Sequence, residues 1–170
     1  MATGNKGKLV EIRRLLDDRD MLVIPQSRFD FEPAEETGST FLENALLKAQ
    51  HAATETGLMA IADDSGIVVD ALDGMPGVYS ARFAGQDAND AENVDKLLAD
   101  MTGVEDRGAR FECVAVAVFP YQNREPLVAR GTWLGQIATE RGGSGGFGYD
   151  PIFFDPTLGK CAAEDRKSVV

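Results

Sequence analysis

The sequence predicts an α/β fold in which a mixed β-sheet is flanked by helices. Segments with helical spacing alternate with strand-like segments up to Met101, and two long strand-like segments then follow one another. No repeat or linker divides the chain, and its 170 residues are enough for one domain to bury a core without disulfides. We therefore expect a single domain.

The first predicted elements are a short amphipathic helix and a strand. The helix is expected to begin near Asn5, because apolar residues recur after it at helical spacing: Leu9, Ile12, Leu15 and Leu16. Residues 21–25 predict a strand, and residues 26–38 predict a loop that contains the acidic pair Glu35 and Glu36.

A second helix has well-marked boundaries. Thr40 and Glu43 have the spacing of a capping box, in which each residue satisfies a free backbone N–H of the other. One apolar stripe continues from there: Phe41, Ala45, Ala49 and Ala52. Glycine readily adopts the left-handed conformation that ends a helix, so this helix is predicted to end near Gly57.

Strands are predicted on both sides of Asp63 and Asp64. The apolar run 58–62 leads into these two acids, and residues 66–72 predict a returning strand before the turn-rich segment 73–77.

The second half predicts one helix and a strand pair. Apolar residues recur at helical spacing before an expected end near Gly103: Val94, Leu97, Leu98 and Met101. Residues 111–119 and 127–134 predict two paired strands joined by residues 121–126.

Composition indicates a soluble, cytoplasmic protein with no membrane partner. Hydrophobic residues make up 44% and charged residues 26%, no apolar run reaches membrane-spanning length, and no secretory pattern follows Met1. The net charge of -11 argues against binding to a nucleic acid, although Mg²⁺ and a few lysines would let an acidic protein bind a nucleotide. Cys113 and Cys161 lack metal-ligand spacing, and Cys113 is expected to be a buried thiol in an apolar strand.

Asp63 and Asp64 place two carboxylates at the end of an apolar run. Asp63-Asp64-Ser65-Gly66 also has the composition of an ordinary turn. A turn does not need adjacent acids, however, and like charges repel unless a cation or solvent separates them. Mg²⁺ binds through one or two carboxylates and leaves other positions to water and phosphates. With Glu35 and Glu36, the pair suggests a cation-assisted phosphate site.

The opening residues 2–8 (Ala-Thr-Gly-Asn-Lys-Gly-Lys) suggest an anion site. A glycine-containing turn before a helix presents free N–H groups and the positive end of the helix dipole, and Lys8 could add a full charge. The motif is not a P-loop, because two residues rather than four separate its glycines and Leu9 replaces the Ser or Thr. A capped surface helix explains the same residues.

A glycine-rich stretch at 142–151 is the third candidate. A flexible loop explains its first half, whereas Phe147, Tyr149 and Asp150 offer stacking rings and a carboxylate on backbone that can approach a ligand closely. A base-binding loop fits this mixture. His51 is the single histidine and lacks a plausible nucleophile partner, so we assign it no catalytic role.

Six ordered motifs resemble one enzyme family. They are residues 2–8, 35–38 (Glu-Glu-Thr-Gly), 41–45 (Phe-Leu-Glu-Asn-Ala), 60–66 (Ala-Ile-Ala-Asp-Asp-Ser-Gly), 79–83 (Tyr-Ser-Ala-Arg-Phe) and 145–151 (Gly-Gly-Phe-Gly-Tyr-Asp-Pro). From Ala2 to about Glu164, the chain resembles the non-canonical purine nucleoside triphosphate pyrophosphatases, also known as inosine or xanthosine triphosphatases.

The resemblance implies Mg²⁺-dependent hydrolysis of ITP, dITP and XTP to the monophosphate and pyrophosphate. It also implies an elongated α/β domain with a central active-site cleft, and a homodimer. The implied substrate-binding residues are Thr3, Asn5, Lys8 and Lys48 at the phosphates, Ser65, and Phe147, Gly148, Tyr149 and Asp150 around the base. Glu36 and Asp64 would bind the metal, Asp64 would be the general base, and Asp63 would assist at the metal or orient the attacking water.

The chain departs from the family pattern at both ends. Family members have several apolar residues before the equivalent of Ala2, so we expect a short first strand here. After the equivalent of Glu164 they continue into a segment with a lysine and a Ser-His-Arg motif that contacts base and phosphates. Residues 165–170 read instead as a translated sequencing-adapter stretch and are expected to be a non-native tail on a pyrophosphatase domain spanning 1–164.

Three functions therefore remain open from the sequence. The leading one is the pyrophosphatase, for which Glu36, Asp64 and Lys8 are retained. The second is a nucleotide-binding protein with little turnover, which the absent Ser-His-Arg segment favours. The third is a related hydrolase for another modified nucleotide, which product analysis would distinguish.

Overall fold

A computed structural model describes residues 1–3, 6–16, 19, 21–121 and 123–164. The chain forms two compact units: Met1–Asp64 with Cys113–Arg130, and Ser65–Glu112 with the described part of Gly131–Val170. We refer to these as the first and second unit. No helix in the described ranges is long and apolar enough to cross a membrane.

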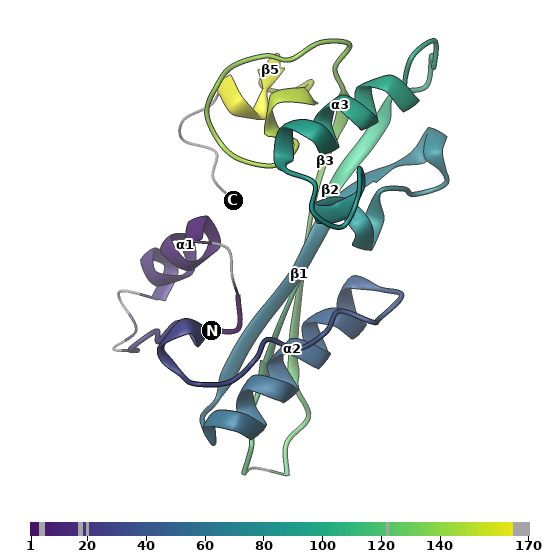
Figure 1. The fold of residues 1–170 in the computed structure, drawn as a ribbon. Helices are drawn as coiled ribbons and strands as arrows, with labels where there is room; N and C mark the ends of the chain where they lie inside the picture. The colour runs from purple at the N-terminus through teal and green to yellow at the C-terminus, as the bar shows by residue number, and fades with distance from the viewer. Residues whose placement is uncertain (4–5, 17–18, 20, 122, 165–170) are drawn as a thin grey trace. The chain divides into compact units, whose positions relative to one another are not determined.

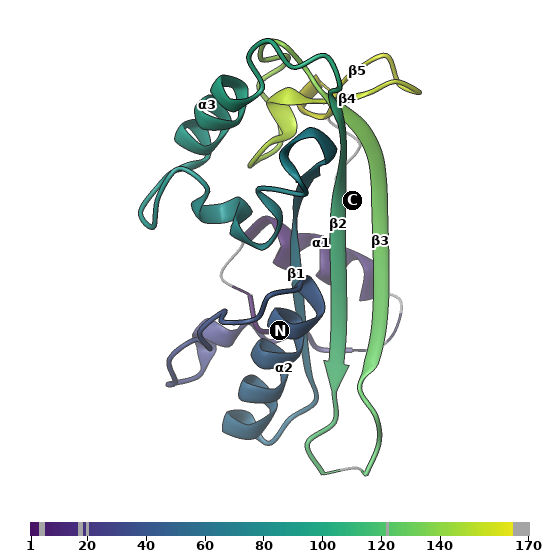
Figure 2. The same ribbon diagram turned by 90° about the vertical axis from the view of Figure 1, so that its right-hand side faces the viewer.

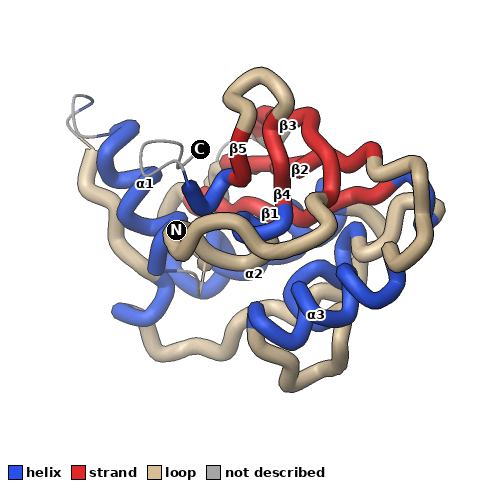
Figure 3. The backbone as a smooth tube through the Cα atoms, turned by 90° about the horizontal axis from the view of Figure 1, so that it is seen from above, coloured by secondary structure: helices blue, strands red, loops and turns tan. Residues whose placement is uncertain are grey.

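The fold is α/β and contains a five-stranded sheet with strand order β1-β2-β3-β4-β5. The strands are β1 (Ala60–Val69), β2 (Gly108–Val118), β3 (Leu127–Ile137), β4 (Phe153–Asp155) and β5 (Lys160–Cys161). The sheet is antiparallel (Figure 2), with Ile137 opposite Phe153 and Asp155 opposite Lys160. Its strands are the red segments in Figure 3. Within the described ranges, the predicted parallel component is limited to a bridge between Ala2 and Ala62, as expected for a short first strand.

In the described part of the chain, three α-helices accompany the sheet: α1 (Lys6–Leu16), α2 (Phe41–Thr56) and α3 (Asp90–Asp100). The predicted capping box of α2 is confirmed, because Thr40 accepts from the Glu43 N–H and Glu43 accepts from the Thr40 N–H. Gly57 ends the helix with a φ of 66°.

The first unit packs small side chains between α2 and β1, which lie side by side in Figures 1 and 2. The helix buries Phe41 and a row of alanines: Ala45, Ala49, Ala52 and Ala53. Alanine lets a helix approach a strand closely, so polar side chains on the same helix can reach the strand.

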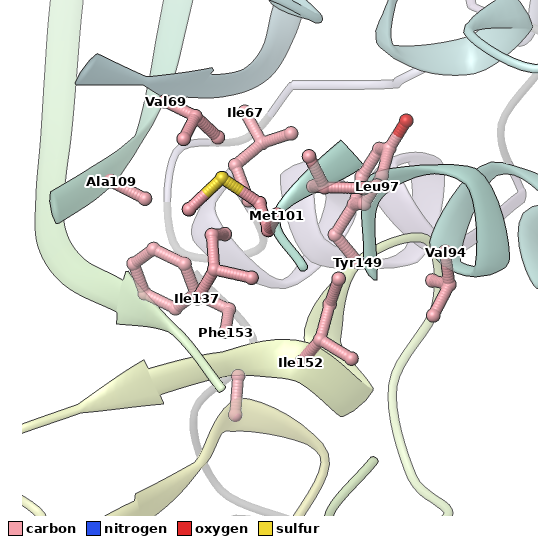
Figure 4. Packing of buried hydrophobic residues seen from close by; sticks show 11 residues of the cluster. Ile67, Val69, Val94, Leu97, Met101, Ala109, Ile137, Tyr149, Ile152 and Phe153 are labelled. Atoms are coloured by element: carbon pink, nitrogen blue, oxygen red, sulfur yellow. The ribbon is translucent and has the colours of Figure 1, made fainter. Parts of the chain in front are cut away.

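The second unit has its own apolar core, shown in Figure 4. Its largest fully buried side chains come from β1, from α3 and the residue that follows it, from the end of β3, and from the start of β4 and the residue before it: Ile67, Leu97, Met101, Ile137, Ile152 and Phe153. This core fixes α3 on the sheet and also contains Tyr149, which is 5% exposed.

Two strand predictions are wrong. Residues 21–25 form no strand: the Met1 amino group donates to Ile24 O, and the Arg13 side chain donates to Val23 O. The predicted turn at 63–66 and the separate strand at 66–72 are also wrong, since β1 continues through Gly66 to Val69. Gly66 serves a close approach instead: a Cβ there would lie 2.5 Å from the Gly77 carbonyl oxygen.

The prediction that Cys113 is buried is wrong as well. Cys113 is exposed on β2, whereas Val114 and Val116 are buried. Successive side chains of a strand face opposite sides, so an apolar neighbourhood in sequence did not determine which side this thiol occupies.

Candidate active site

The candidate active site in the first unit centres on Asp63 and Asp64 in the interior of β1. Each of these residues is 7% exposed. Adjacent residues of a strand point to opposite faces, and each carboxylate accordingly pairs with a lysine from a different helix. Asp63 pairs with Lys8 of α1, and Asp64 pairs with Lys48 of α2. The two neighbouring carboxylates are therefore neutralised by separate lysines.

Asp64 has the more fully described surroundings. Lys48 Nζ lies 3.4 Å from Asp64 Oδ1 and 2.6 Å from Glu36 Oε1, so one ammonium group joins two carboxylates. Asn44, which is fully buried, donates through Nδ2 to Asp64 Oδ2 at 3.1 Å. Asn44 Oδ1 in turn accepts from Gly38 N at 2.8 Å. The loop before α2 is thus joined to the carboxylate by one side chain.

Burial and charge act against each other at this pair. Burial raises the pKa of the Asp64 carboxyl, and although Lys48 and the Asn44 hydrogen bond oppose it, the pKa stays above its ordinary value. For Lys48, burial favours a lower pKa, but the Glu36 hydrogen bond and the charges of Asp64, Glu36 and Asp63 raise the net pKa. Lys48 is therefore charged at neutral pH, next to a carboxylate that is a stronger base than an exposed one.

The N-terminal motif contributes Lys8 to this site. Lys8 lies on α1, in the first turn after the bridge between Ala2 and Ala62, and it reaches Asp63 across 55 residues of sequence. Thr3 is half-buried next to that bridge. Asn5, the remaining residue predicted in this motif, lies outside the described residues.

Glu36 and Asp64 are suitable ligands for Mg²⁺. One oxygen of each points to the same cation, Lys48 Nζ, so a positive group between them is already favoured in this fold. Two hard carboxylates are as many as Mg²⁺ requires when water and substrate phosphates fill its other positions. Among the described residues, no group of three or more His, Cys, Asp and Glu side chains could hold a metal ion without such help.

The predicted base-binding residues lie in the second unit and differ in exposure. Phe147 is 43% exposed, whereas the ring of Tyr149 lies in the core and its hydroxyl donates to Ser80 O at 2.8 Å. Asp150 Oδ2 accepts from Phe147 N at 2.9 Å, and Gly148 provides a positive φ of 57°. Ser65, also in this unit, is half-buried in β1. Of the two rings, Phe147 is thus the one that can stack on a ligand.

A cavity of about 310 Å³ in the first unit does not contain the predicted site residues. It is lined by apolar side chains that include Leu22, Phe29, Phe31 and Met59. His51 lies on the same unit, with Nε2 2.7 Å from Glu32 O and its ring 5.4 Å from Phe31. Neither feature supplies a nucleophile or a metal ligand to Asp64.

Two residues of the site regions were missed in the sequence. Asn44 was assigned no role from the sequence, yet it is the buried partner of Asp64; its place beside an alanine stripe was the available signal. Asp90, which accepts from Gly148 N at 2.7 Å, gave no local signal because 58 residues separate the two in sequence.

Known proteins resemble this chain over nearly its whole length. The dITP/XTP pyrophosphatase of Yersinia pseudotuberculosis is 57% identical over 166 residues, which are 96% of this chain and 84% of that protein. The solved structure of a HAM1 protein from Coxiella burnetii has 46% identity and a TM-score of 0.92, covering 98% of this chain and 85% of that one. The solved structure of a nucleoside-triphosphatase, or dITP/XTP pyrophosphatase, from Mycobacterium abscessus has 41% identity and a TM-score of 0.83. The match covers 97% of this chain and 87% of that one.

Residues 1–169 of this chain match the family model of the Ham1 family. With this match and relatives more than half identical to it, the chain belongs to the Ham1 family.

Proposed function

We propose that this chain hydrolyses non-canonical purine nucleoside triphosphates, namely ITP, dITP and XTP, to the monophosphate and pyrophosphate with Mg²⁺ as cofactor. Removal of such nucleotides would keep them out of DNA and RNA. The observation that supports this most is the pair of buried carboxylates on β1, each matched to a lysine from a separate helix. The names of the relatives, dITP/XTP pyrophosphatases, support the substrate class.

Asp64 is the proposed general base. Water is a poor nucleophile, so the site must orient it and take its proton as the phosphorus is attacked. A carboxyl whose pKa is raised by burial accepts that proton more readily than an exposed one, and Asn44 holds it in one orientation. Asp63 would assist at the metal or orient the attacking water.

The phosphates require positive charge in an acidic protein. Lys8 and Lys48 each project into the first unit from a helix, and both are held in place by the carboxylates. We propose that they bind the phosphates together with Thr3 and Asn5, and that they stabilise the charge developing on the pyrophosphate leaving group. Glu36 and Asp64 would hold the Mg²⁺, which when bound adds further positive charge at the phosphates.

Selection of the base is assigned to the loop around Phe147. Its exposed ring offers a stacking surface, while the backbone groups of Gly148 and the Asp150 carboxylate lie beside it. A site that hydrogen-bonds a 6-keto purine leaves polar groups unpaired when adenine enters, and this penalises ATP. Ser65 and Tyr149 are the remaining residues that we propose for substrate binding, and the Tyr149 ring lies in the core of the second unit.

Hydrolysis measurements test the proposal directly. Purified protein would be incubated with ITP, XTP, GTP or ATP and Mg²⁺, and pyrophosphate release would be followed in parallel with Asp64→Asn. We expect release from ITP and XTP, at least tenfold less from ATP, and none from Asp64→Asn, since the amide cannot act as a base. Equal rates for all four nucleotides would reject the proposed substrate class.

The metal, the assembly and the location are parts of the same proposal. We expect a chelator to stop hydrolysis and added Mg²⁺ to restore it, and full activity after exhaustive chelation would contradict the metal assignment. We also propose that the protein is cytoplasmic, as its composition indicates, and that it is a homodimer, as the resemblance to this enzyme family implies. Sedimentation at micromolar concentration distinguishes a dimer from a monomer of 18.3 kDa.

A further inference from the structure

The glycine-rich loop of the second unit is joined to α3 at both of its ends. At the far end, Gly148 N donates to Asp90 Oδ2 at 2.7 Å. At the near end, Arg141 donates to Asp95 Oδ1 at 2.7 Å and to Ala91 O at 3.0 Å. These contacts join segments 46 to 58 residues apart in sequence, and α3 itself is fixed by the core. The helix can therefore serve as a rigid support for the loop.

Within the loop, the backbone of Phe147 has little room to change. Phe147 N donates to Asp150 Oδ2, and Gly146 has a φ of 72° where an added Cβ would lie 2.8 Å from Asp150 Cγ. Gly145 N donates to Ala163 O at 3.0 Å. Phe147 nevertheless remains 43% exposed, so a fixed backbone presents a residue whose ring is open to a ligand.

Asp90 is well placed to hold this backbone. It is the first residue of α3, and the capping box between Asn89 and Glu92 fixes the start of that helix. A carboxylate in the first turn is favoured by the helix dipole, and a charged acceptor makes a stronger hydrogen bond to an N–H than a neutral one. Asp90 and Asp150 thus accept from the successive N–H groups of Gly148 and Phe147.

We propose that Asp90 is a positioning residue that sets where the Phe147 ring meets the purine base of the substrate. Asp90 would not touch the reacting atoms, and its effect would pass through the Gly148 backbone. The inference rests on the proposed function, because it assumes that Phe147 stacks on the base. According to this inference, the start of α3 contributes to recognition of the base and not to phosphate binding.

Substitutions of Asp90 test this assignment against a merely structural role. We expect Asp90→Ala to raise the KM for ITP roughly fivefold, the effect of losing an exposed charged hydrogen bond, with kcat changed less than twofold. Asp90→Asn keeps an acceptor oxygen and should recover most of the loss. Asp100→Ala is the matched control, since it removes an aspartate of the same helix whose partner is Lys96 and not the loop.

Inhibition by tripolyphosphate, which has no base, provides the second readout. Its inhibition constant should be unchanged in Asp90→Ala, because only base recognition is altered. An unchanged KM for ITP, or an equal loss for ITP and tripolyphosphate, would overturn the inference while leaving the proposed function intact.

A binding measurement covers the case in which turnover is too slow to follow. The dissociation constant of ITP, measured by calorimetry in an Asp64→Asn background, should rise roughly fivefold when Asp90→Ala is added. Absence of any ITP binding to the parent protein would reject the proposed function and the inference together.

Discussion

Replacement of Lys48 by methionine tests the electrostatic description of the site. Methionine keeps the length and the apolar stem but removes the charge that joins Asp64 to Glu36. Lys48 Nζ lies 3.4 Å and 2.6 Å from the two carboxylates, and its side chain is 16% exposed. The variant therefore leaves two carboxylates close together with no opposite charge between them.

The size of the effect follows from burial. Removal of one partner of a buried ion pair costs about 3–5 kcal/mol in free energy of unfolding. The Glu36 side chain is 32% exposed, so water screens part of the loss. We expect Lys48→Met to lower the free energy of unfolding by about 2 kcal/mol at pH 8.

The loss should depend on pH in one direction. Burial already raises the pKa of Asp64 above its ordinary value of 3.8, and Lys48 is the largest influence that opposes this rise. Without Lys48 the pKa rises further, so the folded variant binds a proton more readily than the unfolded chain. Protonation then stabilises the folded state as the pH falls through the raised pKa. The difference from the wild type should therefore be largest at pH 8 and should shrink toward pH 5.

Urea unfolding at pH 8, 6.5 and 5 measures this difference. Lys48→Met combined with Asp64→Asn should regain stability at pH 8, since the Glu36 carboxylate then no longer has the charge of Asp64 close to it. Lys96→Met is the control, because it breaks an exposed pair on α3 and should cost no more than about 0.5 kcal/mol at any of these pH values. A loss that is the same at pH 8 and pH 5 would refute the reasoning.

Three further changes address other parts of the molecule. Asn44→Leu should cost about 2 kcal/mol in free energy of unfolding, because Asp64 and the Gly38 N–H each lose their hydrogen bond to Asn44. The variant should also move the acid limb of the pH–activity profile to higher pH, because the lost hydrogen bond lowers the pKa of Asp64. The equally buried Asn93→Leu in the second unit should destabilise without moving that limb, and identical profiles for both variants would contradict the role of Asn44. Gly146→Ala should cost about 1–2 kcal/mol and weaken ITP binding, as its φ of 72° and the neighbouring Asp150 oppose a side chain. Gly131→Ala, where a Cβ would meet nothing within 4 Å, should be nearly neutral, and similar losses for both alanines would refute the argument. An alkylating reagent should label one thiol quickly, and mass spectrometry should map the label to Cys113, which is exposed. Cys161 should react slowly because it is buried and burial raises its pKa, so fast labelling of Cys161 would contradict the fold.

Local sequence rules predicted the helices well because their determinants are local. The capping box and Gly57 delimited α2, and the apolar repeat located α1 and the end of α3. The start of α3 also had a readable signal, the Asn89 and Glu92 capping box, which the apolar pattern alone did not include. Hydrogen bonds within one turn of the chain can be inferred from spacing.

The errors arose where tertiary contacts decide the structure. Asp-Asp-Ser-Gly has the composition of a turn, yet β1 continues through it because lysines from two helices neutralise the acids and Gly66 admits a close neighbour. The partners Asn44 and Asp64 lie 20 residues apart, and Asp90 and Gly148 lie 58 apart. Spacing rules contain no information about pairs at such separations.

Phosphorus NMR of the reaction products tests the central claim most directly. ITP and Mg²⁺ would be incubated with the wild-type protein and with Asp64→Asn, and the phosphorus signals would be recorded over time. We predict that the wild type converts ITP to inosine monophosphate and pyrophosphate, whereas Asp64→Asn leaves the triphosphate intact. Release of orthophosphate with inosine diphosphate, or equal conversion by Asp64→Asn, would contradict a pyrophosphohydrolase built on the buried carboxylate of Asp64.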